Sequence, residues 1–220
     1  MSKLALTKPT LIMMYGYPGA GKTFLSRQLS QDIQIAQVQG ERIRGELFEE
    51  PRYDKQENDI VEHLMLYMTE EFLAAGISVL YDTNAMRLGQ RRELREMARK
   101  AKAQTMLVWL QIDIESAFSR VNKRDKRRAD DRFAMDLDRT SFESYASRMQ
   151  NPSTTEDYIV MSGKHPYTTQ RSAIIKKLYD LRLLDAASSN SKMVKPELVN
   201  LVPNRMGGRV DTSRRNILIR

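Results

Sequence analysis

Eight consecutive residues near the start of the chain, Gly16 to Thr23, limit most strongly what this sequence folds into. They read GYPGAGKT and fill every position of the pattern G-x-x-x-x-G-K-[ST]. The run 11–15 before them is apolar and strand-like, and the apolar residues of the run 24–29 after them recur at helical spacing. Because a strand, this loop and a helix in that order form a phosphate-binding site, the sequence predicts a P-loop.

Each part of the loop has an expected role. The glycines let backbone N–H groups turn inward around a polyphosphate, and the following helix presents the positive end of its dipole to the same charge. Lys22 is expected to reach the β- and γ-phosphates of a nucleotide, and Thr23 to bind Mg²⁺. The predicted phosphate-binding residues are Gly16, Tyr17, Pro18, Gly19, Ala20, Gly21, Lys22 and Thr23.

Composition narrows the class of protein. A length of 220 residues with 41% hydrophobic content suits one domain with one sizeable core and an appendage. No apolar run approaches the roughly 20 residues that span a bilayer, and residues 1–8 lack the apolar core of a secretory signal, so a cytoplasmic protein is expected. With no cysteine and two histidines, the sequence excludes disulfides and a thiolate metal site and disfavours zinc catalysis.

Positive charge is concentrated in the second half of the chain. The formal net charge is +8, yet residues 1–115 are close to neutral, and the excess of lysine and arginine falls in 116–185 and 186–220. Such asymmetry suggests anionic partners, namely nucleotides, phosphorylated substrates or nucleic acid. The alternative is a solvated basic surface that aids solubility.

Strand-like and helix-like segments alternate through residue 184, which predicts a parallel α/β sheet with helices on both faces. The expected strands are 11–15, 35–38, 77–81, 105–112 and 158–161. The expected helices are 22–30, 41–50, 55–75, 90–103, 114–123, 137–149 and 168–184. Residues 186–192 read as a linker, so we expect one domain over 1–185 and a basic tail over 186–220.

Beyond the loop, two further segments give the chain a family resemblance. Residues 40–44 read GERIR, and Asp82, Thr83 and Asn84 precede a helix with Arg91 and Arg92. Over residues 10–184 the chain resembles the small P-loop kinases of the AAA family. This ATP-binding group includes the 5′-polynucleotide kinase domain of phage repair enzymes, the zeta-type toxins and small-molecule kinases. The resemblance implies a three-layer α/β/α fold, with ATP and Mg²⁺ as cofactors.

Glu41 and Arg44 match a pair of functional residues in the polynucleotide kinases. There an acidic residue after the second strand takes the proton from the acceptor hydroxyl, and an arginine three positions later holds the reacting phosphates. The family acid is usually aspartate, so Glu41 is a departure that moves the carboxylate by one methylene. The alternative is a surface ion pair between residues three apart on one helix.

Asp82 stands at the expected end of its strand, where a Walker-B carboxylate would orient Mg²⁺ near Thr23. Thr83 and Asn84 would then face the substrate. The residue after Asp82 is not acidic, which disfavours a hydrolytic ATPase because the usual water-activating glutamate is missing. The alternative roles are a helix cap for Asp82 and turn chemistry for Asn84.

The basic run after the fourth strand lies where P-loop kinases carry a mobile lid, here expected over about 120–136. Lid arginines close over the triphosphate and stabilise charge that develops on the transferred phosphoryl group. The first candidates are Arg120, Arg124 and Arg128; a solvated face or a nucleic-acid patch is the alternative. His165 follows the last strand, where related kinases hold the adenine ring.

The leading hypothesis is an ATP-dependent kinase that transfers a γ-phosphoryl group to a hydroxyl. A polynucleotide 5′-hydroxyl, a nucleoside and a small metabolite all remain open as acceptors, as does the oligomeric state. The alternative is a nucleic-acid-associated P-loop protein in which ATP serves as a switch. The predicted catalytic residues are Lys22, Glu41, Arg44, Asp82, Arg124 and Arg128; Arg120 and Arg124 are also expected to bind the nucleotide, and Thr23 and Asp82 the metal.

Overall fold

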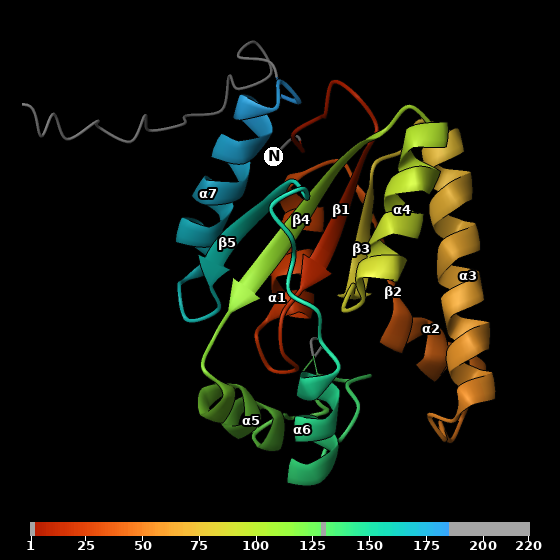
Figure 1. Ribbon diagram of the computed structural model, residues 1–220, viewed down its shortest axis with the longest axis vertical. Helices are drawn as coiled ribbons and strands as arrows, with labels where there is room; N and C mark the ends of the chain where they lie inside the picture. Colours follow the sequence, from red (N-terminus) through yellow and green to blue (C-terminus); the bar gives the residue numbers. More distant parts are fainter. Residues whose placement is uncertain (1–2, 129–130, 185–220) are drawn as a thin grey trace, which may run out of the picture. The chain divides into compact units, whose positions relative to one another are not determined.

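Five parallel strands form a single sheet in the computed structural model, in the order β2-β3-β1-β4-β5 (Figure 1). The structure describes residues 3–128 and 131–184. The predicted linker and basic tail, 186–220, lie outside these residues. The strands are β1 (Thr10–Tyr15), β2 (Ala36–Gln39), β3 (Val79–Asn84), β4 (Gln104–Gln111) and β5 (Tyr158–Ser162).

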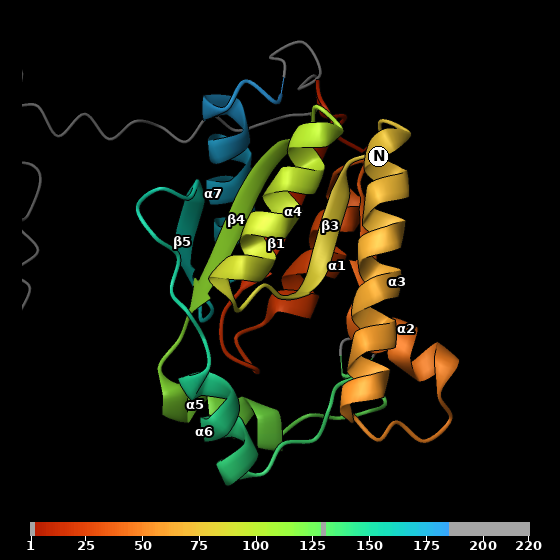
Figure 2. The ribbon, with the colours of Figure 1, turned by 45° about the vertical axis from the view of Figure 1, so that its right-hand side comes forward.

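Helices cover both faces of the sheet, and the predicted three-layer α/β/α fold is confirmed (Figures 1 and 2). Parallel strands need such crossover connections, because successive strands must run in the same direction. The helices are α1 (Lys22–Asp32), α2 (Gly40–Leu47), α3 (Lys55–Ala74), α4 (Leu88–Lys100), α5 (Ile114–Asn122), α6 (Arg139–Ser147) and α7 (Tyr167–Asp180).

The central strand β1 divides the core into two layers because its side chains alternate between the faces. Ile12 and Met14 pack with residues of α1 and α7, while Leu11 and Met13 pack with residues of α3 and α4. All six residues of β1 are buried. A strand that is apolar on both faces is typical of the centre of a parallel sheet.

A third, smaller core lies beyond the carboxyl ends of the strands. The strands point toward α5 and α6, which lie together past the tips of the arrows (Figures 1 and 2). Ala117 and Val121 of α5 pack against Leu137 and Phe142, and Tyr17 of the P-loop packs against the same cluster. The predicted P-loop therefore contacts the helices that flank the basic run.

The element boundaries differ from the expected ones chiefly in β3, which begins at Val79 and ends at Asn84. Asp82 pairs with Gln39 of β2. Asn84 pairs with Met14 of β1, after a register shift between Met13 and Met14. The residues Asp82, Thr83 and Asn84 thus belong to the strand instead of following it, because neighbouring strands on both sides extend its ladder.

Most helices are shorter than expected, and three of them by two residues or more. The helix expected over 41–50 ends at Leu47, the one over 137–149 spans Arg139–Ser147, and the last ends at Asp180. Two residues after Asp180, Arg182 has a φ of 57°, and this left-handed backbone prevents the last helix from continuing. Among the described residues no helix is both long and apolar enough to cross a membrane.

Candidate functional site

The P-loop connects β1 to α1, and two of its glycines are required by the backbone. Gly16 and Gly19 have φ values of 149° and 82°, in the region that favours glycine. A Cβ on Gly16 would lie 2.5 Å from the carbonyl oxygen of Leu110, and one on Gly19 would lie 2.3 Å from that of Ala117. The loop therefore fits closely between β4 and α5.

Lys22 opens α1, and its side chain folds back over the loop. Its Nζ donates hydrogen bonds to the carbonyl oxygens of Gly16 at 2.8 Å and Tyr17 at 2.9 Å. Burial lowers the pKa of Lys22 to about 8, although the carboxylate of Asp82 opposes this effect. The ammonium group is thus held where an anion in the loop would meet it.

A cavity of about 500 Å³ extends from the P-loop to the basic run; we call it the phosphate cavity. The loop lines one side of it, and cationic side chains line much of the rest. Its lining is Pro18, Gly19, Ala20, Gly21, Lys22, Thr23, Phe24, Arg120, Lys123, Arg124, Arg128, Asp131, Ala134, Gly163, Lys164, His165 and Gln170. Such an excess of positive charge beside a helix N-terminus suits a polyphosphate.

Thr23 and Asp82, the predicted metal ligands, are in contact with each other. The Thr23 hydroxyl donates to Oδ1 of Asp82 at 3.4 Å, and the amide of Gln37 donates to Oδ2 at 2.8 Å. Burial raises the pKa of Asp82, and the hydrogen bond from Gln37 partly offsets this effect. One hydroxyl and one carboxylate fit Mg²⁺, which keeps several waters and takes its other ligands from phosphate oxygens.

Asn84 supports the P-loop directly. Its Oδ1 accepts a hydrogen bond from the backbone N–H of Gly16 at 3.2 Å, and the residue is only 6% exposed. Its Nδ2 is buried without a hydrogen-bond partner and lies beside the hydroxyl of Tyr145 on α6. The register of β3 thus places Asn84 between the loop and a helix that follows the lid.

Glu41 and Arg44 lie in the first turns of α2, on the same face but not in contact with the phosphate cavity. Oε2 of Glu41 is 3.8 Å from Nε of Arg44, which exceeds hydrogen-bond distance. Partial burial raises the pKa of Glu41, while Arg44, Tyr53 and the lid residue Arg124 act against this rise. The side chain as a whole is 41% exposed, although its Oε2 atom is buried.

The guanidinium of Arg44 is held by residues of α3, which the sequence did not reveal. Its Nη1 donates to Glu57 at 3.2 Å and its Nη2 to Asn58 at 2.6 Å. The ring of Tyr53 stacks on its other side, 4.6 Å from Cζ. A buried arginine needs a buried acid, and the matching sequence feature is an acidic residue in the first turn of the following helix.

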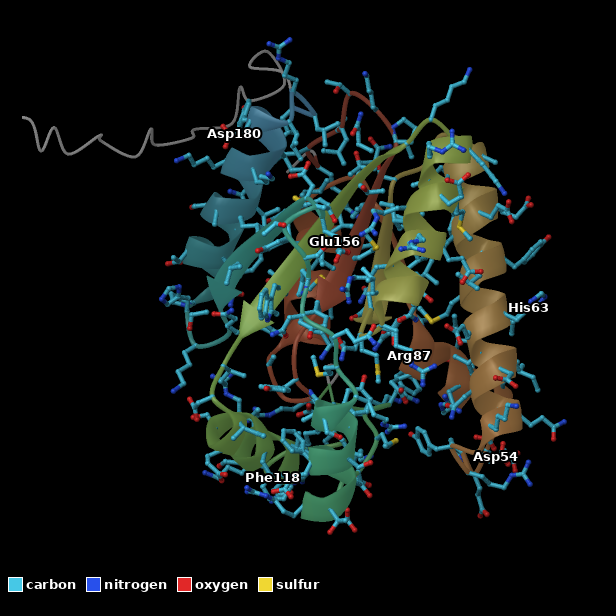
Figure 3. All side chains as sticks on the ribbon, viewed as in Figure 1. Asp54, His63, Arg87, Phe118, Glu156 and Asp180 are labelled. Atoms are coloured by element: carbon cyan, nitrogen blue, oxygen red, sulfur yellow. The ribbon has the colours of Figure 1, made fainter. Side chains whose placement is uncertain are left out.

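Arg91 is an anchor of the fold. It is fully buried and pairs with Glu156 through Nε at 2.8 Å and Nη2 at 3.0 Å. Its Nη1 also donates to the carbonyl oxygens of Ala85 and Gln150. Glu156, labelled in Figure 3, precedes β5, so this pair fastens α4 to the segment that returns from α6 to the sheet.

The segment predicted to be a lid is described over residues 120–128 and 131–136, and it begins in α5. Arg120 donates to the carbonyl oxygen of Gly163 at 2.9 Å, and Arg124 to that of Met135 at 2.7 Å. A Cβ on Gly45 would lie 2.4 Å from the ring of Phe133, so the lid also touches α2. Arg120, Arg124 and Arg128 all line the phosphate cavity, where the sequence placed them.

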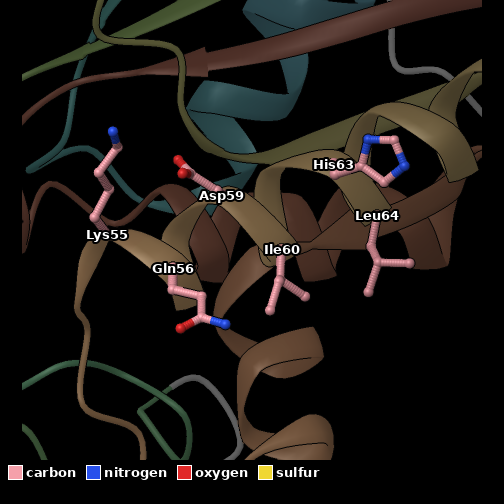
Figure 4. Close-up of a pocket in the computed structure, with 6 residues that line it drawn as sticks. All are labelled: Lys55, Gln56, Asp59, Ile60, His63 and Leu64. Atoms are coloured by element: carbon pink, nitrogen blue, oxygen red, sulfur yellow. The ribbon is translucent and has the colours of Figure 1, made fainter.

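A second hollow, of about 660 Å³, lies on the surface of α3 (Figure 4). All six residues that line it come from this one helix: Lys55, Gln56, Asp59, Ile60, His63 and Leu64. None of the predicted site residues takes part. The phosphate cavity is therefore the candidate site, because among the described residues the P-loop and the basic side chains of 120–128 line it together, and its Thr23 contacts the buried carboxylate of Asp82.

Comparisons with known proteins show which family and which folds this chain is similar to. A family model described as an AAA domain matches residues 11–152. A search of curated proteins returned no match. A sugar kinase from Janibacter sp. HTCC2649 superposes with a TM-score of 0.57 at 15% identity, over 84% of this chain and 99% of that one.

Two further solved structures are similar. Kti12 from Chaetomium thermophilum, in complex with ADP-AlF3, has a TM-score of 0.60 at 20% identity and covers 77% of this chain and 97% of its own. The APS kinase CysC from Mycobacterium tuberculosis, in complex with AMPPNP and APS, has a TM-score of 0.57 at 15% identity and covers 78% and 98%. At these identities the likeness shows a common fold.

Proposed function

The chain belongs to the AAA domain family, and on that premise we propose that it is an ATP-dependent kinase that transfers a γ-phosphoryl group to a hydroxyl. One observation supports the proposal: Arg124 is near both the P-loop residue Lys22 and the predicted base Glu41. It lines the phosphate cavity, and its charge acts on both Lys22 and Glu41. An arginine in this position can stabilise charge on a phosphoryl group in transit between the two.

The residues of the chain divide the work. The backbone amides of the P-loop and Lys22 hold the β- and γ-phosphates, and Thr23 and Asp82 would hold Mg²⁺, which neutralises phosphate charge when bound. Glu41 accepts the proton of the acceptor hydroxyl, because its side chain is partly exposed and Nε of Arg44, at 3.8 Å, lies beyond hydrogen-bond distance. Arg120, Arg124 and Arg128 close over the transferred group.

Two further points support a phosphotransferase. The residue after Asp82 is Thr83, so the position of a water-activating glutamate is taken by a hydroxyl side chain. Two of the structural neighbours are described as a sugar kinase and an APS kinase. The acceptor is a hydroxyl-bearing molecule whose identity requires a direct screen.

The test follows labelled γ-phosphate from ATP in the presence of Mg²⁺ and a panel of sugars, nucleosides and 5′-hydroxyl oligonucleotides. We expect the label on one class of acceptor, and we expect the Glu41→Gln variant to bind ATP while transferring slowly. Label released only as inorganic phosphate would contradict the proposal. ATP binding without any turnover, combined with ATP-dependent binding of oligonucleotides, would support a nucleotide switch instead.

A further inference from the structure

Glu57 is a buried acid at the start of α3 that receives an unusual number of donors. It is 2% exposed, and its carboxylate accepts hydrogen bonds from the backbone N–H groups of Arg52 and Tyr53 at 2.8–3.0 Å. Oε2 also accepts from Nη1 of Arg44 at 3.2 Å. Burial alone would raise the pKa of Glu57, but these donors hold it below its usual range. The group is therefore a fixed negative charge.

That charge decides which way Arg44 points. Glu57 and Asn58 take the two terminal nitrogens of the guanidinium, so only Nε faces Glu41. Nε of Arg44 and Oε2 of Glu41 are both buried, 3.8 Å apart, and neither has a hydrogen-bond partner. Without such anchors, an arginine guanidinium tends to face the nearest carboxylate and form a bidentate ion pair with two parallel hydrogen bonds.

We propose that Glu57 is a positioning residue that holds the guanidinium of Arg44 away from Glu41 and so keeps the Glu41 carboxylate free to act as a base. The inference rests on the proposed function, in which Glu41 receives the proton of the acceptor hydroxyl. A carboxylate locked in a bidentate ion pair is a weak base, because the cation stabilises its ionised form.

Other groups near Glu41 also affect its pKa. Arg44 belongs to α2, Tyr53 to the segment before α3, and Arg124 and Lys126 to the lid. The charge of Glu41 also contributes to the raised pKa of Tyr145 on α6. Among the described residues that act on Glu41, Arg44 is the one whose orientation Glu57 controls by direct contact.

The test replaces Glu57 by glutamine, which retains a carbonyl oxygen for the amides of Arg52 and Tyr53 but removes the charge that holds Arg44. Carboxyl resonances of ¹³C-labelled glutamate, followed by NMR in the full-length protein without any acceptor, report the pKa of Glu41. We expect the Glu57→Gln change to lower the pKa of Glu41 by roughly 1 unit, since a close guanidinium lowers a carboxyl pKa by about 1–3 units. An unchanged pKa overturns the proposal.

Two more variants separate positioning from a general loss of structure. In an Arg44→Ala background, Glu57→Gln should have no further effect on the pKa of Glu41, because the group through which Glu57 acts is gone. Glu71→Gln, an exposed change of the same charge in α3, is the matched control and should leave the pKa unchanged. A shift that persists without Arg44 would assign the effect to the fold.

Kinetics add a readout that distinguishes the two proposals. Once an acceptor is known, Glu57→Gln should lower kcat about tenfold with little change in the KM for ATP. The acid limb of the profile of kcat against pH should move to lower pH. If Glu57→Gln fails to fold, Asn58→Ala removes the second anchor of Arg44 and should shift Glu41 in the same direction. A shifted pKa in a protein that phosphorylates nothing would keep this inference and reject the kinase; normal transfer with an unshifted pKa would do the reverse.

Discussion

Gly19 of the P-loop lies against the backbone of Ala117 in α5 so closely that no side chain fits between them: a Cβ on Gly19 would stand 2.3 Å from the Ala117 carbonyl oxygen. The P-loop and α5, the helix that leads into the predicted lid, are thus in direct contact. Tyr17 adds to this contact, because it packs on the small core that includes Phe142. The conformation of the P-loop and the position of α5 therefore depend on the same few residues.

Replacing Gly19 by alanine should weaken ATP binding at least tenfold, because the loop must move away from α5 to accommodate a methyl group. Gly76 is the matched control: its φ of 77° resembles the 82° of Gly19, but a Cβ there meets nothing within 4 Å. Both changes should destabilise the fold by roughly 1–2 kcal/mol for the left-handed backbone. Calorimetric titration with Mg-ATP, alongside thermal unfolding, measures both effects; equal ATP affinities of the two variants would contradict the expectation.

The pH dependence of ATP binding should report on Lys22. Burial lowers its pKa to about 8 in the free protein, and bound phosphates should raise it again, so binding takes up a proton above that pH. Affinity should then be steady below about pH 8 and fall by up to roughly tenfold per unit above it. The Lys22→Ala variant should bind ATP more weakly and lose this dependence. If the ATP affinity of the parent protein stays constant up to about pH 9.5, Lys22 does not bind the phosphates.

Glu41→Gln should slow phosphoryl transfer by roughly 10²-fold while leaving ATP binding intact, since it keeps size and removes the proton acceptor. Glu41→Asp restores the residue usual in the polynucleotide kinases and should keep measurable activity. Single-turnover transfer at saturating ATP and acceptor measures each rate. A Glu41→Gln enzyme whose transfer rate lies within about twofold of the parent rate would contradict a general-base role for Glu41. Asp82 would then be the next candidate for the base.

The buried pair of Arg91 and Glu156 should contribute strongly to stability. Replacing Arg91 by methionine leaves Glu156 without its main partner and should cost about 3–5 kcal/mol. The control is Arg99→Met, which breaks the exposed pair with Glu96 and should cost less than about 1 kcal/mol. Urea unfolding of the two variants decides the matter, and equal losses would show that Arg91 is not the anchor that its contacts indicate.

The same pair should make the free energy of unfolding decrease at acidic pH. Burial would raise the pKa of Glu156, but the hydrogen bonds from Arg91, Ser153 and Arg95 prevail and hold it at about 2. A carboxyl whose pKa is lower in the folded state stabilises the protein above its ordinary pKa of 4.5, and this contribution is lost as pH falls toward about 2. In the Glu156→Gln variant, the slope of unfolding free energy against pH should be shallower in this range.

Local patterns were sufficient for the P-loop and the order of the strands and helices. The loop, the strand before it and the helix after it are adjacent in the chain, so their identity depends on neighbouring residues alone. The expected strands all appear, with shifts at their ends. Asp82 and Thr23 are in contact because the carboxyl ends of neighbouring parallel strands lie at one edge of the sheet.

By itself the sequence determined which residue types reach the phosphate cavity: the loop with Lys22 and Thr23, and the lid arginines. Only the tertiary structure decided what Arg44 and Arg91 do. Glu57 is 13 positions from Arg44 and Glu156 is 65 positions from Arg91, so no periodicity or local spacing connects the members of either pair. A buried arginine must find its acid through the packing of separate elements, and that packing depends on the whole sheet and the helices that cover it.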